Sequence, residues 1–278
     1  MMKSLAVYKA KRGTKSAVIY IFLIIAAAVS LFPFFWMAVG ATNDTLAITS
    51  GSFRIGGQFA VNWEKLKELA DVLRIFWNSL FITVVTTVLS IFFCAMAGFG
   101  FEKYTFKAKE FIYSLFLLSM MIPFAAQMIP LFKMMNQFDL MDTAVAVILP
   151  SVALPFLIFF FRQSFKSFPT ELLEAARIDG ANEIRIFFQM VLPPMKSTLA
   201  AGAIYAFMKQ WNNYLWPLIV LQSNENKTLT LLLSSLASAY VVDYGPLMLA
   251  IVISTLPMIV IFLTMQKQFV AGIVGTSK

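Results

Sequence analysis

The most constraining feature of this sequence is a series of long apolar runs that contain almost no charge. Each run has a length close to the roughly 17 to 25 residues that carry a helix across a bilayer. The runs cover 17–40, 75–101, 111–132, 144–161, 198–221 and 247–265, and one charged residue, Lys209, falls inside the fifth. Lipid leaves only helices and closed barrels as spanning structures, and runs of this length favour helices. We therefore predict an all-α integral membrane protein whose six transmembrane helices form a single domain over 1–278.

The composition supports a membrane protein and excludes most kinds of enzyme. Hydrophobic residues make up 60% of the chain and charged residues 13%, whereas soluble domains average about 45–50% and about 25%. The chain contains no histidine, which excludes catalysis by Ser-His-Asp or Cys-His groups and metal sites built on imidazole. Its single cysteine, Cys94, forms neither an internal disulfide nor a thiolate cluster. We therefore expect neither an enzyme nor a metal site.

The distribution of Lys and Arg between the runs predicts which side of the membrane each loop faces. Fifteen of the 22 lie in the N-terminal segment and in the segments on its side of the membrane, and six lie on the other side. Because Lys and Arg accumulate in cytoplasmic loops, both termini are predicted to be cytoplasmic. The same asymmetry accounts for the net charge of +8, so no nucleic-acid partner is expected. The first run exceeds the h-region of a signal peptide, about 7 to 15 residues, and we expect it to remain as an anchor.

An apolar segment that we do not count among the six spans is 228–242. It has 15 residues, several of them Ser or Thr, and it is followed by Asp243-Tyr244-Gly245-Pro246. This length falls short of the roughly 20 residues that a span needs. We interpret the segment as an outside loop or a re-entrant helix.

The cytoplasmic segment 162–196 is long, and its pattern predicts a helix, a sharp turn and a second helix. Glu174 follows Pro169 in the first helix, where carboxylates stabilise the positive end of the helix dipole. Gly180 provides a position where a positive φ costs little, and Asn182 is a suitable N-cap for the second helix. From these residues alone two interpretations stay open. The hairpin either docks on another protein or lies as an amphipathic element on the lipid headgroups.

A spaced motif runs through this hairpin. Glu174-Ala175-Ala176 is followed after three residues by Gly180, after nine more by Met190, and after one more by Leu192-Pro193. This arrangement resembles the EAA loop of ABC importer permeases, E-A-A-x3-G-x9-I-x-L-P, with Met190 at the usual isoleucine position. The sequence Asp179-Gly180-Ala181 is similar to that of the carbohydrate branch, in particular the smaller permease of maltose-type systems. The resemblance implies the MetI-like fold of type I ABC importers.

The resemblance also implies a role for the hairpin and a set of partners. In that family the loop couples the permease to a cytoplasmic ATPase. The residues concerned here are Glu174, Ala175, Ala176, Asp179, Gly180, Met190, Leu192 and Pro193. The chain has no G-x-x-x-x-G-K-[ST] sequence to cradle nucleotide phosphates, so ATP and Mg²⁺ are expected on the ATPase. The implied partners are a second permease in a heterodimer, two ATPase subunits, an extracytoplasmic solute-binding protein and the lipid of a prokaryotic cell membrane.

Polar residues within the spans are candidates for the solute pathway, because lipid disfavours them. Sugars pair with amides through their hydroxyls and stack on aromatic rings. The polar candidates are Asn78, Gln127, Lys209, Gln210, Asn212 and Asn213. Those that we expect to contact a sugar are Asn78, Trp211, Asn212, Asn213 and Tyr214. Alternatively, the aromatic residues form an interfacial belt and the amides satisfy backbone broken near Pro217.

The expected function is that of a carbohydrate importer permease. The alternatives are an importer of another solute, such as glycerol phosphate or amino acids, and a channel. A phosphate would require several convergent cations, whereas Lys209 is the single charged residue inside the spans. This favours a neutral sugar.

Overall fold

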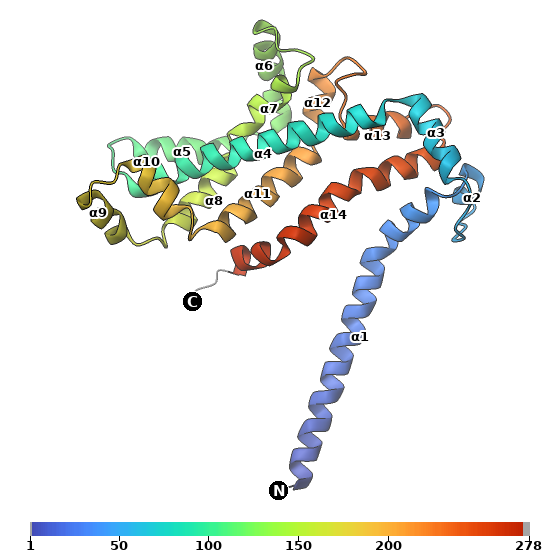
Figure 1. Ribbon diagram of the computed structural model, residues 1–278, viewed down its shortest axis with the longest axis horizontal. Coiled ribbons are helices and arrows are strands. Elements are labelled where there is room, and N and C mark those ends of the chain that lie inside the picture. The colour runs from blue at the N-terminus through green and yellow to red at the C-terminus, as the bar shows by residue number, and fades with distance from the viewer. Residues whose placement is uncertain (1, 275–278) are drawn as a thin grey trace. The chain divides into compact units, whose positions relative to one another are not determined.

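The computed structural model describes the backbone of residues 2–274 and the side chains of residues 16 and 18–267. Over this range the chain consists of helices joined by turns and loops, without a strand, which confirms the all-α prediction (Figure 1). The chain forms two compact units, Met1–Leu69 with Leu236–Ile253, and Ala70–Ser235 with Ser254–Lys278. The basic side chains before the first span lie outside the described residues. A single domain and cytoplasmic termini therefore stay predictions.

The first unit contains α1 (Met2–Gly40), α2 (Thr45–Thr49), α3 (Phe59–Leu69) and the beginning of α14 (Tyr244–Val274). Polar contacts fix the corner after α1. The buried Asn62 amide donates to the carbonyls of Ala41, at 3.0 Å, and Asn43, at 2.9 Å. Asp243 accepts hydrogen bonds from Thr45 at 2.8 Å and Lys65 at 2.6 Å. These bonds pair the polar groups of the segment that follows α1 with groups from distant parts of the sequence.

The second unit is built around α4 (Val72–Lys103), which packs against α7 (Ala144–Val152), α8 (Pro155–Phe165) and α11 (Lys196–Trp211). Figure 1 shows α8 and α11 beside the α4 helix. Glycine allows the closest approach. A Cβ atom at Gly98 would lie 2.7 Å from Phe161 Cβ and 2.8 Å from the Arg162 backbone nitrogen. The absence of a side chain at Gly98 therefore sets the distance between α4 and α8.

We expect Gly98→Ala to lower the free energy of unfolding by about 1–3 kcal/mol, because the added methyl group meets backbone that has no room to move. The matched control is Gly100→Ala in the same helix, where a Cβ would meet no atom within 4 Å. Alanine there should be neutral or slightly stabilising. Unfolding in mild detergent can be followed by a maleimide dye at Cys94, which is fully buried. Equal unfolding midpoints for the two variants would contradict the close approach.

Several predicted spans are interrupted helices. Among the described residues, three uninterrupted helices are long and apolar enough to cross a membrane, Val18–Gly40, Val72–Lys103 and Tyr244–Lys267. Two bent pairs raise this number to five: α5 (Lys109–Ser119) with α6 (Phe124–Gln137), bent by 103°, and α7 with α8, bent by 40°. The predicted ranges 111–132 and 144–161 thus hold two helices each. Pro123 is the N-cap of α6, and Pro155 is the first residue of α8. The helix before each proline is interrupted there, because a residue before proline avoids helical geometry.

The predicted range 198–221 also holds two helices, α11 and α12 (Leu215–Val220). An unbroken helix would place the Pro217 ring against the carbonyl of Asn213, four residues earlier. This carbonyl instead accepts a hydrogen bond from Thr230 Oγ1 at 2.9 Å. The segment 228–242, predicted as a loop or re-entrant helix, contains α13 (Leu229–Ala237). Six membrane crossings stay a prediction.

Candidate functional site

The segment 162–196 forms the predicted hairpin. Its first helix is α9 (Thr170–Ile178), and its second arm consists of α10 (Glu183–Arg185) followed by η1 (Ile186–Val191), a π-helical turn. Gly180 has φ = 81° between the two arms, which confirms the predicted turn. The Asn182 side chain accepts a hydrogen bond from the Arg185 backbone N–H at 2.8 Å, which confirms the predicted N-cap.

One face of the hairpin is buried against the ends of α4 and α8. The buried hairpin side chains are Leu173, Ala176, Ile186, Phe187 and Val191, and they share one apolar core with Phe99 and Phe165. The face is therefore held by the same burial of apolar surface that holds the helices together.

Polar contacts anchor the hairpin to the last residues of α4. Lys103 Nζ donates to the Phe168 carbonyl at 2.6 Å. Glu183 accepts a hydrogen bond from the Tyr104 hydroxyl and, at 2.8 Å, from Arg177 Nε. The hydrogen bonds from Arg177 and then Tyr104 lower the pKa of Glu183. Burial, with the Glu183 carboxylate, raises the pKa of Tyr104 to about 12. At neutral pH the pair is thus an ionised carboxylate and a protonated phenol.

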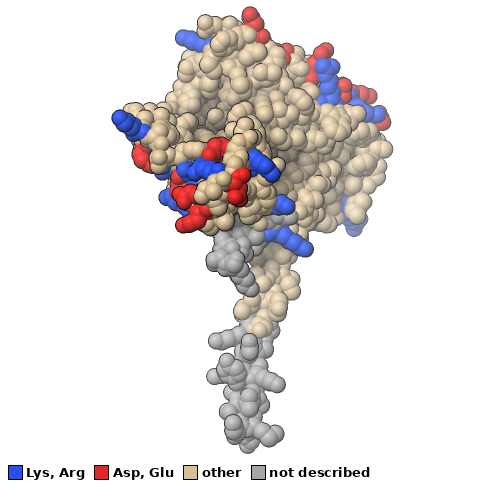
Figure 2. All heavy atoms as spheres, turned by 60° about the vertical axis from the view of Figure 1, so that its left-hand side comes forward, with Lys and Arg blue, Asp and Glu red and all other residues tan. Residues whose placement is uncertain are grey.

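The rest of the hairpin surface is exposed and combines large apolar side chains with charged ones. Ile178 is 87% exposed, Ile184 70% and Leu172 49%. Glu174 is exposed on the same side of α9 as Ile178 and makes no hydrogen bond or ion pair with the residues that the structure describes. Figure 2 shows charged side chains gathered around this end of the second unit, with uncharged surface between them. An apolar surface of this kind, rimmed by charge, is typical of a protein interaction site.

The hairpin residues predicted to contact an ATPase divide between the two faces. Glu174, Ala175, Asp179, Gly180 and Pro193 are exposed. Ala176 is buried, and Met190 and Leu192 are half-buried against the core. The exposed apolar residues Ile178 and Ile184 lie within the predicted hairpin, 162–196, but were not among the predicted contact residues. The signal was available, because Ile178 stands four residues after Glu174 and so shares its face.

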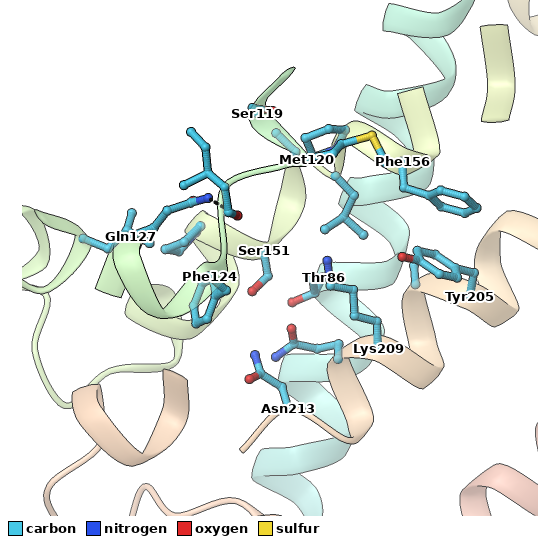
Figure 3. A pocket seen from close by; sticks show the side chains of 18 residues that line it. Thr86, Ser119, Met120, Phe124, Gln127, Ser151, Phe156, Tyr205, Lys209 and Asn213 are labelled. Carbon is cyan, nitrogen blue, oxygen red and sulfur yellow. Dashed lines mark hydrogen bonds between the residues drawn. The ribbon is translucent and has the colours of Figure 1, made fainter. Parts of the chain in front are cut away.

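A second candidate site is a cavity of about 450 Å³ inside the second unit. It lies among α4, α6, α11 and the break between α7 and α8 (Figure 3). Hydroxyl and amide groups line it together with one ammonium group and aromatic rings. The polar lining residues are Thr86, Ser119, Gln127, Ser151, Tyr205, Lys209, Gln210 and Asn213. Thr86, Ser151 and Lys209 converge from three helices in Figure 3.

Asn213, one of the five residues predicted to contact the sugar, lines this cavity, as do the polar candidates Gln127, Lys209 and Gln210. Asn78 donates to the carbonyls of Glu225 and Lys227 at 2.7 and 3.3 Å. The other three make contacts elsewhere: Trp211 donates to the Ser254 carbonyl, Asn212 to the Met208 carbonyl, and Tyr214 accepts from Ser234.

Among the lining residues that were not predicted, Tyr205 had a signal in the sequence. It stands four residues before the candidate Lys209 and eight before the candidate Asn213, which places the three on one side of α11. Thr86, Ser119 and Ser151 carried no comparable signal, because single Ser and Thr residues are frequent in membrane helices and their hydroxyls often bond to backbone.

Comparison with known proteins identifies the family. Residues 90–274 match the family described as "Binding-protein-dependent transport system inner membrane component". The lactose transport system permease protein LacG of Rhizobium radiobacter is 47% identical over 268 residues, 96% of this chain and 98% of LacG. The arabinooligosaccharides transport system permease protein AraQ of Halalkalibacterium halodurans is 43% identical over 198 residues, 71% of each chain.

The fold is also found among solved structures. A chain in the crystal structure of a bacterial ABC transporter involved in the import of the acidic polysaccharide alginate superposes with a TM-score of 0.78. The two chains are 23% identical, and the match covers 91% of this chain and 96% of that one. The MetI-like permease fold predicted from the motif is thereby confirmed.

These likenesses establish what kind of protein the chain is. It is a multi-pass, membrane-embedded permease subunit of an ABC importer and not itself an enzyme. Permeases of this kind work with an ATPase and a solute-binding protein. The chain belongs to the family of inner membrane components of binding-protein-dependent transport systems.

Proposed function

We propose that this chain is the transmembrane permease subunit of an ATP-driven importer of carbohydrate, either a sugar or an oligosaccharide. It pairs with a second, non-identical permease. Two cytoplasmic ATPase subunits bind ATP and Mg²⁺, and this chain binds no cofactor. An extracytoplasmic binding protein delivers the solute to a prokaryotic cell membrane, and both termini of this chain lie in the cytoplasm.

The observation that carries the proposal is the division of the hairpin into a buried and an exposed face. Leu173 and Ala176 fix α9 to the core of the second unit, while Ile178 and Ile184 stay exposed. Glu174 has no partner among the described residues, so its charge is available to a basic group on another protein. This combination suits docking into a cleft of an ATPase subunit better than a position on lipid headgroups, where anionic lipid would repel Glu174.

The anchors indicate how movement of the hairpin reaches the pathway. Lys103 and Tyr104 join the hairpin to the end of α4, and Thr86 of the same helix lines the cavity. When two ATPase subunits close on ATP, a docked hairpin moves as a rigid body with the helix to which it is anchored. The cavity then changes the side to which it is open, which is alternating access.

The carbohydrate assignment is supported by the relatives and by the lining of the cavity. LacG, at 47% identity over 98% of its length, is named a lactose permease. The cavity combines hydroxyls, amides and aromatic rings, which together pair with sugar hydroxyls and stack on sugar faces. The alternative solutes, glycerol phosphate and amino acids, carry charged groups that require more than the single ammonium of Lys209. A channel would use rings of charge, and no acidic residue lines this cavity.

The test is purification of the tagged chain from its native membrane in mild detergent, followed by identification of stoichiometric companions. We expect a P-loop ATPase, a second permease and a binding protein. The reconstituted complex should take up lactose or a related neutral oligosaccharide in an ATP-dependent manner. Recovery of the chain without an ATPase, under conditions that preserve other complexes, would count against the proposal.

A further inference from the structure

The cavity beside Lys209 has the size and lining of a ligand site. Its volume, about 450 Å³, lies within the roughly 300–1,000 Å³ typical of small-molecule sites. Interrupted helices form two of its walls, at residues 120–122 between α5 and α6 and at Ala153 and Leu154 between α7 and α8. Solute sites in membrane transporters are frequently built where helices are discontinuous, because side chains and free backbone groups meet there.

Two polar groups at this cavity lack a partner among the described residues. Thr86 is 1% exposed, and its Oγ1 has no hydrogen-bond partner. An unpaired buried hydroxyl costs free energy, so a native protein retains one where a ligand or water pairs with it. Lys209 forms no hydrogen bond or ion pair with described residues, and no Asp or Glu lines the cavity. A charge within a membrane helix without a counter-ion is similarly costly and marks a functional position.

The chemistry of the lining selects among ligands. Lys209 is the single charged group, and an anion is usually held by several cations or by a bidentate arginine. A sugar hydroxyl accepts from an ammonium group and donates to or accepts from a threonine hydroxyl and an amide. Phe124, Phe156 and Tyr205 add aromatic surface to the same walls, which suits the apolar face of a sugar ring.

We infer that this chain itself provides a subsite for one neutral sugar ring of the transported solute, in the cavity lined by Thr86, Lys209 and Asn213. The inference rests on the proposed function, since it specifies where the imported carbohydrate contacts this subunit. Lys209 Nζ donates to ring hydroxyls, and Thr86 Oγ1 gains the hydrogen-bond partner that it lacks in the chain alone. Asn213 adds amide hydrogen bonds from the end of α11.

The test uses the whole complex in proteoliposomes, with its binding protein and with lactose, oligosaccharides of arabinose and diacetylchitobiose as probes. The two site variants are Lys209→Met and Thr86→Val. Each is expected to lower the kcat/KM of uptake by about tenfold or more, because a hydrogen bond to the sugar is lost. The controls are Lys133→Met, which removes a charge away from the cavity, and Thr87→Val. Thr87 carries an unpartnered hydroxyl in the same helix but does not line the cavity, and both controls should stay within about twofold.

A second measurement reports whether the probe occupies the cavity and does not depend on transport. In a Cys94→Ala background, Lys209→Cys places the single thiol of this chain in the cavity. A saturating concentration of the transported probe should slow its modification by a methanethiosulfonate reagent by about fivefold or more, as expected for a bound site under mass action. Thr87→Cys should show no protection.

The outcomes separate this inference from the proposed function. If the wild-type complex takes up none of the neutral probes, both fail. If it takes up a probe while Lys209→Met and Thr86→Val match the wild type, the subsite alone is overturned. Loss of the second permease from the purified Lys209→Met complex would also overturn the inference, because it would assign the ammonium group to the contact between subunits.

Discussion

Replacing Arg162 with alanine is expected to lower the free energy of unfolding by about 3 kcal/mol, a large effect for one side chain. Arg162 is 8% exposed at the end of α8. Its guanidinium forms two hydrogen bonds with Glu110, at 2.7 and 3.1 Å, and one with Glu102 at 3.3 Å. It also lies 3.9 Å from the centre of the Tyr113 ring. Its removal leaves Glu102 partly buried beside a cavity and breaks the link between α4, α5 and α8.

The measurement is thermal unfolding of the purified complex in detergent, followed by the reaction of Cys94 with a maleimide dye. Arg185→Ala is the matched control, since the Arg185 side chain is exposed and donates one hydrogen bond, to Gln189. It should stay within about 0.5 kcal/mol. An unchanged unfolding midpoint for Arg162→Ala would refute a structural role for this cluster.

The second large effect is expected on function rather than on stability. Glu174→Ala should reduce solute-stimulated ATP hydrolysis by about tenfold or more, because truncating a charged residue at the centre of an interface costs about 2 kcal/mol or more. Membrane insertion and the unfolding midpoint should not change, since Glu174 is exposed and contacts no charged partner among described residues. The assay is ATP hydrolysis by the reconstituted complex, with the amount of bound ATPase subunit measured in the same preparation.

Glu171→Ala is the control for this experiment. Glu171 is an exposed carboxylate in the first turn of the same helix, so its removal changes charge and helix dipole to a similar extent but lies outside the E-A-A motif. We expect ATP hydrolysis within about twofold of the wild type. A parallel loss of insertion and hydrolysis in Glu174→Ala would mean that the residue stabilises the loop and does not transmit force.

The hairpin was predictable from sequence because local residues determine it. Gly180 and Asn182 each specify a backbone conformation on their own, one by tolerating positive φ and the other by capping a helix. Which face would be buried was less clear, since Leu172, Leu173, Ile178 and Ile184 are all apolar. Burial of Leu173 but not of Ile178 depends on α4 and α8, which are distant in the sequence.

The interruptions of the spans and the cavity were harder to predict for a related reason. Apolar composition indicates how long a buried segment is but not the direction in which the segment runs. The bend of 103° between α5 and α6 therefore has no signal in the hydropathy of the sequence. The cavity gathers residues from several helices, and only the arrangement of these helices reveals that Thr86 and Lys209 meet. Trp211 is the opposite case. It stands beside amide residues in the sequence, but its ring is buried against Phe76 and Phe207 and does not line the cavity.

The π-helical turn η1 explains why spacing within the hairpin motif matters as much as residue identity. The Leu192 N–H bonds to the Phe187 carbonyl at 3.0 Å, five residues earlier, and Ile186 and Val191 are both fully buried at that same interval. An ordinary α-helical turn would instead bring Met190 into register with Ile186. The wide turn thus accommodates one residue more than a regular helix would need. A deletion of one exposed residue between Gly180 and Leu192 would convert η1 to a regular helix. The second arm of the hairpin would then turn about its own axis, although the predicted contact residues would all be present. We therefore expect homologous chains whose hairpin docks in the same way to keep the same number of residues between Gly180 and Leu192, even where the residues themselves differ.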